Sequence, residues 1–328
     1  MNRFRAYRIH RRDGAVRAAL ESVSVDELSD GDVLIRVSHS GINYKDALAA
    51  TGTSPILRRY PLIGGIDLAG TVERSGDPAF RPGDAVLVTG CGLSETRDGG
   101  YAEYARVPAA AVVAMPPGLD AASAMAVGTA GFAAALAIVR MQRMGQPPEL
   151  GPVVVTGATG GVGSLAIDML SAAGYEVAAV TGKPDAHDYL RTLGAAHILP
   201  RLPEAPTAPL ESARWGGAID NVGGSTLAWL LATTRPFGNV ASVGLAAQAQ
   251  FAGSVMPFIL RGVNLLGVNS SSTPRPLRLA VWQRIATDLK PRHLDRIVQR
   301  RITLDELPTA FDDYLHGRVL GRTVVVIG

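Results

Sequence analysis

The chain has 328 residues, more than one hydrophobic core usually holds, so its length favours two domains. Hydrophobic residues at 47% and charged residues at 19% are typical of a globular protein, and a net charge of +3 gives no support for a nucleic-acid partner. The single cysteine, Cys91, excludes an intramolecular disulfide, so we expect a cytoplasmic protein.

Short apolar runs, several of them alternating, characterise the first 120 residues. DVLIRVSHSGIN (32–43), AGTVERSG (69–76) and DAVLVTG (84–90) are broken by Gly, Pro, Asp and Ser, which is typical of strands and turns. GINYKDALAATG (41–52) places four adjacent polar residues, 43–46, between two glycines. In this stretch Lys45 and Asp46 either tune Tyr44 or form an ion pair at the start of a helix.

Residues 121–139, AASAMAVGTAGFAAALAIV, carry no charge and are nominally long enough to cross a bilayer. They consist mostly of small residues and lack an aromatic belt. We therefore predict a buried helix with a glycine interruption, and no membrane partner.

Strands and helices alternate over residues 151–268. VVVTGA is an apolar strand, residues 162–173 have helical spacing and YEVAAVT is a second strand. A helix is predicted over 184–193, and further strands at AIDNV, NVASV and NLLGV. This alternation predicts a parallel sheet covered on both faces. The last sixty residues contain an amphipathic helix near 277–289 and a final strand, RTVVVI.

VVVTGATGGVGS (153–164) is a strand that leads through a glycine-rich turn into a helix, which is typical of a pyrophosphate site. Ala158, Gly160 and Gly163 take the positions of the three glycines in G-x-G-x-x-G, so the first glycine is missing. A purely structural turn is the alternative, because any tight strand-to-helix turn favours glycine.

The end of the second strand indicates which dinucleotide binds. EVAAVT ends in Thr181, Gly182 and Lys183, without the carboxylate that binds the ribose of NAD. Lys183 can neutralise a 2′-phosphate and Thr181 can donate a hydrogen bond to it, so we expect NADPH. Arg201, in ILPR, offers a second positive charge. Alternatively, Lys183 and Arg201 are ordinary surface residues.

Several motifs in a fixed order resemble the medium-chain dehydrogenase/reductase superfamily: GINYKDALAATG, GIDLAGTV (65–72), FRPGDAV (80–86), GGYAEYARV (99–107), GTAGFAAAL (128–136), VTGATGGVGS and GRTVVVI (321–327). Within it, LATTRPFGNVASVGLA and VMPFILRGVNLLGVNS (255–270) resemble the acrylyl-CoA reductases, also known as YhdH-type quinone oxidoreductases. The resemblance implies an α/β fold. A GroES-like β-rich catalytic domain would comprise residues 1–124 and 269–328, and a doubly wound Rossmann domain with a parallel sheet residues 125–268.

Zinc-dependent members of the superfamily hold their metal with a cysteine and a His-Glu pair, among other ligands. At those positions this chain has Asn43 and, after Gly65, the pair Ile66 and Asp67. We therefore expect no metal. Cys91 is interpreted as a small buried residue rather than a nucleophile.

Without zinc, the resemblance implies reduction of an activated C=C bond. NADPH would transfer a hydride to the β-carbon of a 2-enoyl-CoA, most simply acrylyl-CoA, and a proton would be added at the α-carbon to give propanoyl-CoA. The alternatives are a quinone or enone reductase and a non-catalytic NADPH-binding protein.

The resemblance also implies roles for individual residues. Tyr44 would contact the nicotinamide ribose or donate the proton, Asn43 would position the substrate oxygen, and Asp67 would orient its neighbours. The remaining expected cofactor contacts are Thr159, Gly160, Gly161 and Val162 at the pyrophosphate, Thr181, Gly182 and Lys183 with Arg201 at the adenosine phosphate, Leu245, Ile259 and Ser270 at the nicotinamide pocket, and Arg322 from the last strand. Leu245 and Ile259 as core residues, and Arg322 as a strand cap, are the alternatives.

Two further features bear on partners and substrate. The apolar segment 252–268 suits strand pairing across a two-fold axis, so we expect a homodimer. Arg97 and Asp98 stand where many acrylyl-CoA reductases carry a histidine and a bulky aromatic residue, so substrate preference is expected to differ if this loop borders the acyl pocket.

Overall fold

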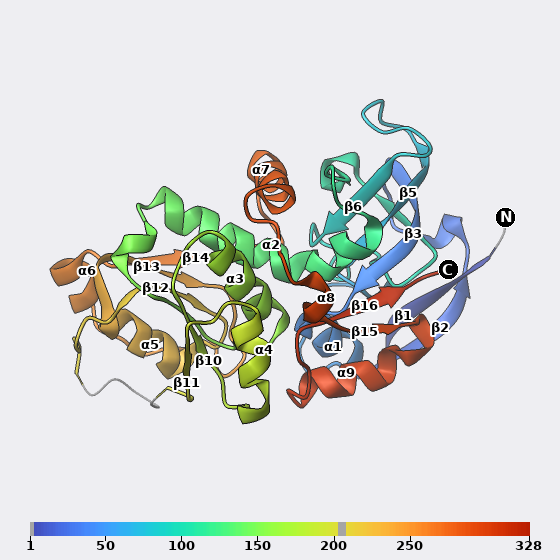
Figure 1. The fold of residues 1–328 in the computed structure, drawn as a ribbon. Helices are drawn as coiled ribbons and strands as arrows, with labels where there is room; N and C mark the ends of the chain where they lie inside the picture. The colour runs from blue at the N-terminus through green and yellow to red at the C-terminus, as the bar shows by residue number, and fades with distance from the viewer. Residues whose placement is uncertain (1–2, 203–207) are drawn as a thin grey trace. The chain divides into compact units, whose positions relative to one another are not determined.

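The computed structural model describes residues 3–202 and 208–328. They form two compact units (Figure 1). The first unit contains Met1–Thr129, Ser271–Ala280 and Val298–Gly328, and the second contains Ala130–Ser270 and Val281–Ile297. The boundaries expected for the catalytic and Rossmann domains, after residues 124 and 268, stay a prediction. Each unit is described by itself.

The first unit contains two sheets in the described part of the chain. The smaller has the order β2-β1-β4 and the larger the order β15-β16-β3-β5-β6-β8, with β7 also pairing with β3. Their bounds are β1 Phe4–Arg12, β2 Ala15–Val23, β3 Val33–Gly41, β4 Leu62–Ile63, β5 Asp67–Ser75, β6 Ala85–Thr89, β7 Tyr104–Val107, β8 Val113–Ala114, β15 Val298–Ile302 and β16 Arg322–Val326. The strands predicted at 32–43, 69–76 and 84–90 are confirmed as β3, β5 and β6. The β1–β2 hairpin was not predicted, because its arginines hide the alternation of apolar residues.

Short helices close the first unit. They are α1 Tyr44–Thr51 and α9 Leu307–Leu315, with the 3₁₀ turns η1 Val25–Glu27, η2 Ala109–Ala111 and η5 Leu304–Glu306. α1 begins where the Asn43 amide donates to the Asp46 carboxylate at 2.8 Å, and it ends at Gly52, whose φ of 74° is left-handed. Phe4, Tyr7 and Phe311 belong to the core that β1 and α9 share.

Helix α2, Ala121–Arg143, contributes residues to both units. Its regular geometry breaks at Gly128, where φ is 51° and ψ is −159°, values that L-residues avoid. Among the described residues it alone is long and apolar enough to span a membrane, and 83% of its apolar window is buried in the protein. The predicted buried helix with a glycine interruption is therefore confirmed.

The second unit is built on a parallel sheet with the order β11-β10-β9-β12-β13-β14 in the described residues. Its strands are β9 Val153–Val155, β10 Val177–Val180, β11 His197–Leu199, β12 Trp215–Asp220, β13 Thr234–Ser242 and β14 Asn264–Gly267. The strand order reverses between β9 and β12, and open parallel sheets bind ligands at the carboxyl ends of the strands beside such a reversal. The parallel sheet predicted from the sequence is confirmed.

The helices of the second unit lie around this sheet (Figure 1). They are α3 Gly161–Ala172, α4 His187–Thr192, α5 Gly224–Thr233, α6 Met256–Arg261 and α8 Leu294–Ile297, with the 3₁₀ turns η3 Pro148–Leu150 and η4 Pro184–Ala186. The helix predicted over 184–193 is shorter, because its first turn is the 3₁₀ turn that Pro184 opens. α7, Arg275–Ala286, starts earlier than the predicted 277–289 and contributes to both units.

Candidate functional site

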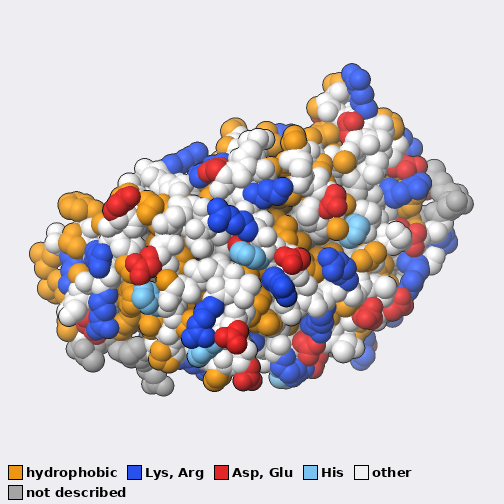
Figure 2. Space-filling model, viewed as in Figure 1, with side chains coloured by type: hydrophobic (Ala, Val, Ile, Leu, Met, Phe, Trp, Pro, Cys, Tyr) orange, Lys and Arg blue, Asp and Glu red, His pale blue; other side chains and the backbone are white. Residues whose placement is uncertain are grey.

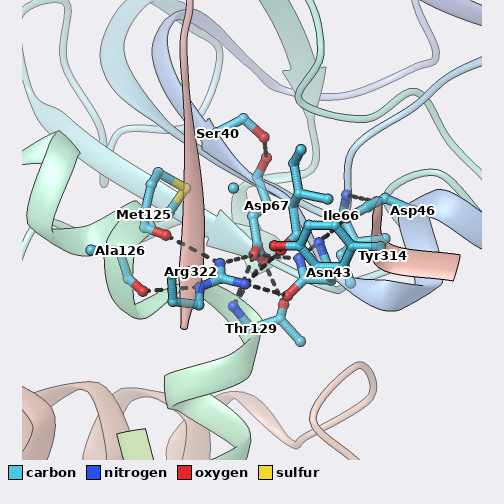
Figure 3. A network of polar contacts seen from close by, with 12 residues as sticks. Ser40, Asn43, Asp46, Ile66, Asp67, Met125, Ala126, Thr129, Tyr314 and Arg322 are labelled. Atoms are coloured by element: carbon cyan, nitrogen blue, oxygen red, sulfur yellow. Dashed lines mark hydrogen bonds and ion pairs between the residues drawn. The ribbon is translucent and has the colours of Figure 1, made fainter. Parts of the chain in front are cut away.

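Four segments of the first unit meet where their regular structure begins or ends. β3 ends at Gly41, α1 begins at Tyr44, β5 begins at Asp67 and β16 begins at Arg322. The break in α2 lies at the same place, because a Cβ on Gly128 would come within 2.6 Å of both Arg322 Nη2 and Asp67 Oδ2. Figure 3 shows the polar side chains of these segments pointing toward one another.

The Asp67 carboxylate is fully buried and accepts hydrogen bonds from two directions. Asn43 Nδ2 donates to Oδ2 at 2.8 Å, and the Thr129 amide and hydroxyl donate at 2.9 and 2.5 Å. Thr129 follows the break at Gly128, so its amide opens a helical segment, where negative charge is favoured. Arg322 Nη2 lies 3.7 Å from Oδ2. The Asp67 carboxyl group is thus surrounded by hydrogen-bond donors and one positive charge.

Arg322 supplies the positive charge of this cluster and is 1% exposed. Its guanidinium donates to four oxygens of the protein: the carbonyls of Ile42 at 2.6 Å, Ala126 at 3.0 Å and Met125 at 3.2 Å, and Asn43 Oδ1 at 3.2 Å. The guanidinium fits because Gly41 and Gly128 lack a Cβ, which at either position would stand 2.6 Å from Nη2. Arg322 is thus an internal link between β16, α1 and α2, and its contact with the cofactor stays a prediction.

The second carboxyl group, Asp46, is also buried. Its Oδ2 accepts the Asn43 amide at 2.8 Å and Asn43 Nδ2 at 3.3 Å, and its Oδ1 accepts the Ile66 amide at 2.9 Å. Burial and, secondarily, the charge of Asp67 raise the pKa of Asp46 to about 7, against the lowering effect of these hydrogen bonds.

Two tyrosines cover the cluster. Tyr101 donates its hydroxyl to the carbonyl of Gly41 at 3.1 Å, and Tyr314 donates to the carbonyl of Ile42 at 3.1 Å. Burial raises the pKa of both hydroxyls, and Asp46 adds to the effect on Tyr101. Both hydroxyl groups therefore stay neutral.

Of the predicted catalytic residues, Asn43 and Asp67 lie together in this cluster, and Tyr44 lies beside it with its side chain 44% exposed. Both amide hydrogens of Asn43 go to carboxylates, so in this arrangement Asn43 holds Asp46 and Asp67, and its action at a substrate oxygen stays a prediction. Lys45 pairs with Glu95, so the alternative of a Lys45–Asp46 ion pair is wrong.

A metal does not fit this cluster. Ile66 offers no ligand atom, and the Asn43 amide faces Asp67 with its hydrogen-bearing nitrogen rather than with an electron pair. Nor do residues 3–202 and 208–328 contain any group of three or more His, Cys, Asp or Glu side chains that could hold a metal ion.

In the second unit, the glycine-rich turn lies at the carboxyl end of β9, beside the reversal in strand order. Thr156 donates to Asp220 Oδ1 at 2.6 Å, and Asn221 Nδ2 donates to the Thr156 carbonyl at 2.8 Å, so the ends of β9 and β12 are tied together. A Cβ on Gly163 would come within 2.4 Å of the Gly157 carbonyl, so only glycine lets α3 pack so closely.

The predicted pyrophosphate contacts are Thr159, Gly160, Gly161 and Val162, which occupy the end of this turn and the start of α3. The first turn of an α-helix leaves its amide N–H groups without partners inside the helix. The residues present therefore fit a dinucleotide pyrophosphate.

The ends of β10 and β11 bring the predicted adenosine-phosphate residues together. Lys183 donates its amide to Thr181 Oγ1 at 3.0 Å, which shapes the turn. A Cβ on Gly182 would stand 2.5 Å from Arg201 Nε, so the Arg201 side chain lies across this glycine. Partial burial lowers the pKa of Lys183. Thr181, Lys183 and the Arg201 side chain that lies across Gly182 thus occupy the turn where an NAD site has a carboxylate, and their contact with a 2′-phosphate stays a prediction.

The three residues expected at the nicotinamide pocket differ in position. Leu245, 62% exposed, follows β13 at the carboxyl ends of the strands, and Ser270 follows β14. Ile259, 71% exposed, lies instead on α6, which contacts β13. The end of α6, Gly262, lies beside Phe237, which is in the first half of β13 and therefore away from the carboxyl ends of the strands. Neither exposed side chain is an ordinary core residue. The structure therefore does not bring Ile259 together with the turn after β9.

The loop after β6 has a structural role that the sequence did not reveal. Asp98 accepts the Ser29 amide and hydroxyl at 2.7 Å each and the Ile63 amide at 2.8 Å, so it is a buried anchor. Cys91 is half-buried and packs against the core of the first unit. Thr129, Tyr101 and Tyr314 were also missed, because neither motif nor spacing links them to Asn43 and Asp67.

Two family models match different parts of the chain. Residues 29–117 match the family model of the alcohol dehydrogenase GroES-like domain, and residues 161–287 match the zinc-binding dehydrogenase model. The chain is 45% identical to the putative quinone oxidoreductase YhfP of Bacillus subtilis, over 98% of both proteins, and 47% identical to the acrylyl-CoA reductase AcuI of Ruegeria pomeroyi, over 95% of both. It superposes on the YhdH oxidoreductase of Salmonella enterica in complex with NADP, with a TM-score of 0.96 and 45% identity, over 99% of this chain and 100% of that one.

Proposed function

The chain belongs to the medium-chain dehydrogenase/reductase superfamily and, within it, to the family of acrylyl-CoA reductases and YhdH-type quinone oxidoreductases; on this basis we propose that it is an NADPH-dependent reductase of the C=C bond of a short 2-enoyl-CoA. Acrylyl-CoA, reduced to propanoyl-CoA, is the first substrate to test. The name of the AcuI relatives supports the substrate class.

The residues at the end of β10 indicate which cofactor the protein prefers. The turn after β10 contains Lys183, and the Arg201 side chain lies across Gly182, so this turn offers positive charge where a carboxylate would repel a 2′-phosphate. Related structures contain NADP or NADPH, and one, the YhfP protein, contains NAD. We therefore expect this chain to prefer NADPH.

When bound, NADPH supplies the hydride that the β-carbon of the enoyl thioester accepts. The residues of this chain hold the reactants and supply the proton. The turn after β9 binds the pyrophosphate through amide N–H groups, with Thr159, Gly160, Gly161 and Val162 as its contacts. Leu245 and Ser270 shape the nicotinamide pocket. Negative charge that gathers on the thioester oxygen requires a hydrogen-bond donor, and the α-carbon requires a proton.

Tyr44 is the residue best placed for one of these tasks. It is the first residue of α1, its side chain is exposed, and the buried cluster beneath it fixes the start of the helix. Tyr44→Phe separates its two proposed roles. If Tyr44 donates the proton, turnover falls and NADPH affinity is unchanged; if it contacts the ribose, NADPH affinity falls.

A quinone or enone reductase is the second candidate, and the name of the YhfP relative favours it. It would use the same hydride donor with a substrate that lacks the CoA group. A non-catalytic NADPH-binding protein is the third candidate, because the glycine-rich turn after β9 and the residues after β10 would serve cofactor binding without any reaction.

We also expect a cytoplasmic homodimer with no nucleic-acid or membrane partner. In the second unit, β14 is one of the two edge strands of the described sheet. Exposed apolar side chains lie on it and on the elements beside it: Phe237, Val255, Ile259, Leu260 and Leu265. Figure 2 shows apolar side chains gathered at the end of this unit that holds α6. Covering them by strand pairing with a second copy would remove an open sheet edge, and the mass measured by light scattering tests it.

The test of function is the loss of NADPH absorbance with acrylyl-CoA, beside NADH and a simple quinone as controls. Rapid turnover specific to NADPH and acrylyl-CoA is expected. Turnover with the quinone alone would support the second candidate. NADPH binding without turnover of either substrate would support the third.

A further inference from the structure

Two carboxyl groups and one guanidinium are enclosed together in the first unit (Figure 3). Asp46 and Asp67 are both buried, and Arg322 is buried beside them. If both carboxyl groups were ionised, two negative charges would face one positive charge. An uncompensated buried charge is strongly unfavourable, and a single bound proton removes it.

The neighbouring groups decide which carboxyl group takes that proton. Asp67 accepts hydrogen bonds from Asn43 and Thr129 and faces the positive charge of Arg322. Asp46 accepts two backbone amides and lies beside the hydroxyl of Tyr101. Burial and the charge of Asp67 raise the pKa of Asp46 to about 7. The proton therefore belongs to Asp46.

Asp46 also joins two segments of the chain. Its Oδ2 accepts the amide of Asn43, which precedes Tyr44, and its Oδ1 accepts the amide of Ile66, which precedes Asp67. The carboxyl group thus bridges the start of α1 and the start of β5. Whatever separates these two segments also moves Tyr44.

We propose that Asp46 is a positioning residue that carries a proton at neutral pH, and that this uncharged bridge holds Tyr44 in the place from which it contacts cofactor or substrate. Loss of the proton leaves Asp46 and Asp67 as two negative charges on either side of Asn43, and their repulsion pushes α1 away from β5. Among the described residues, the other titratable groups that act on Asp46 include Tyr101 and Tyr314 on α9, and Arg322 on β16 lies beside Asp67.

Two variants separate the proton from the bridge. Asp46→Asn has no proton to lose; its single carbonyl oxygen can still accept the Asn43 amide, but its NH2 group cannot accept the Ile66 amide. The variant therefore weakens the bridge equally at every pH, and only its pH dependence is compared with that of the wild type. Asp46→Ala removes the bridge altogether. Asp168→Asn is the matched control, because Asp168 is a buried carboxyl group of the second unit whose partners, Arg292 and His293, lie outside the cluster.

Infrared spectroscopy of the full chain tests the proton directly, because a protonated carboxyl group absorbs apart from a carboxylate. At about pH 6 the wild type should show a protonated band that fades as the pH rises through about 7. The band should be missing in Asp46→Asn and present in Asp168→Asn. A wild-type spectrum identical to that of Asp46→Asn would overturn the proposal, whatever the substrate of the protein.

Fluorescence titration with NADPH tests the positioning and rests on the proposed function. Between about pH 6 and about pH 8.5, wild-type affinity should fall about tenfold relative to Asp46→Asn. The comparison with the variant is needed because the 2′-phosphate of the cofactor titrates in the same range. Asp46→Ala should bind weakly at every pH. Parallel pH profiles of the wild type and Asp46→Asn would overturn the positioning role, even where the infrared band confirmed the proton.

Discussion

In the first unit, Asn43, Asp67 and Arg322 are enclosed and bonded to one another, whereas in the second unit Gly182 and Arg201 lie exposed at the ends of parallel strands. The enclosed groups come from segments far apart in the chain, and their hydrogen bonds and charges are matched within the cluster. The exposed groups come from turns at the ends of adjacent strands, and their polar atoms are open to a ligand. Substitutions should therefore affect folding stability in the first unit and ligand affinity in the second.

The most severe test of this contrast is Arg322→Met. It removes the positive charge beside Asp67 and leaves a buried carboxylate uncompensated, so the free energy of unfolding should fall by about 3–5 kcal/mol. Arg318→Ala is the control, since its exposed pairs with Asp312 and Asp313 are screened by water and should contribute little to stability. Equal denaturation midpoints for the two variants would contradict the contrast.

The pH dependence of stability tests the charge count inside the cluster. The pKa of Asp46 is raised from 3.8 to about 7, so the folded protein binds a proton that the unfolded chain releases. The contribution of Asp46 to stability should therefore be lost as the pH rises from about 4 to about 7, with little change above that range, and should amount to a few kcal/mol. In Asp46→Asn this part of the pH profile, measured by denaturant unfolding, should disappear. If the free energy of unfolding of Asp46→Asn changed with pH as steeply as that of the wild type, another group would cause the pH dependence.

Gly128→Ala tests how tightly the enclosed cluster of the first unit is packed. The new Cβ would lie 2.6 Å from Arg322 and Asp67, at a φ of 51° that disfavours L-residues, so we expect a loss of stability of about 1–3 kcal/mol or more. Gly174→Ala is the matched control, because Gly174 also has a positive φ but open space around it. Its midpoint should shift less. An equal shift would mean that the cluster tolerates a methyl group.

Lys183→Ala should have the smallest effect on folding and a selective effect on the cofactor. Loss of one charge-assisted hydrogen bond at a partly exposed site should weaken NADPH binding about tenfold and leave NADH binding unchanged. Arg191→Ala, an exposed arginine of α4, is the control and should change neither affinity. If NADPH and NADH affinity fell equally, Lys183 would not contact the 2′-phosphate.

The difference between the units also explains what could be predicted from sequence. The strand-turn-helix at residues 153–164 is local, so its residues are visible as a motif, and the parallel sheet follows from the alternation of strands and helices. The links of Asn43 to Asp67 and Arg322 span 24 and 279 positions and have no local signal. The polar residues at 43–46 were recognised, but the burial of Asp46 and its separation from Lys45 depend on contacts with β5 and the loop after β6.

The position of Arg322 has a consequence for the order in which the protein matures on the ribosome. β16, which Arg322 begins, lies between β15 and β3 in the larger sheet, yet 280 positions separate Arg322 from its partner Ile42. During translation the parallel sheet of the second unit emerges complete before β16 does. Until β16 is inserted, Asp46 and Asp67 have no counter-charge and β3 lacks a neighbour, so the nascent first unit should remain open and dependent on chaperones for longer than the second.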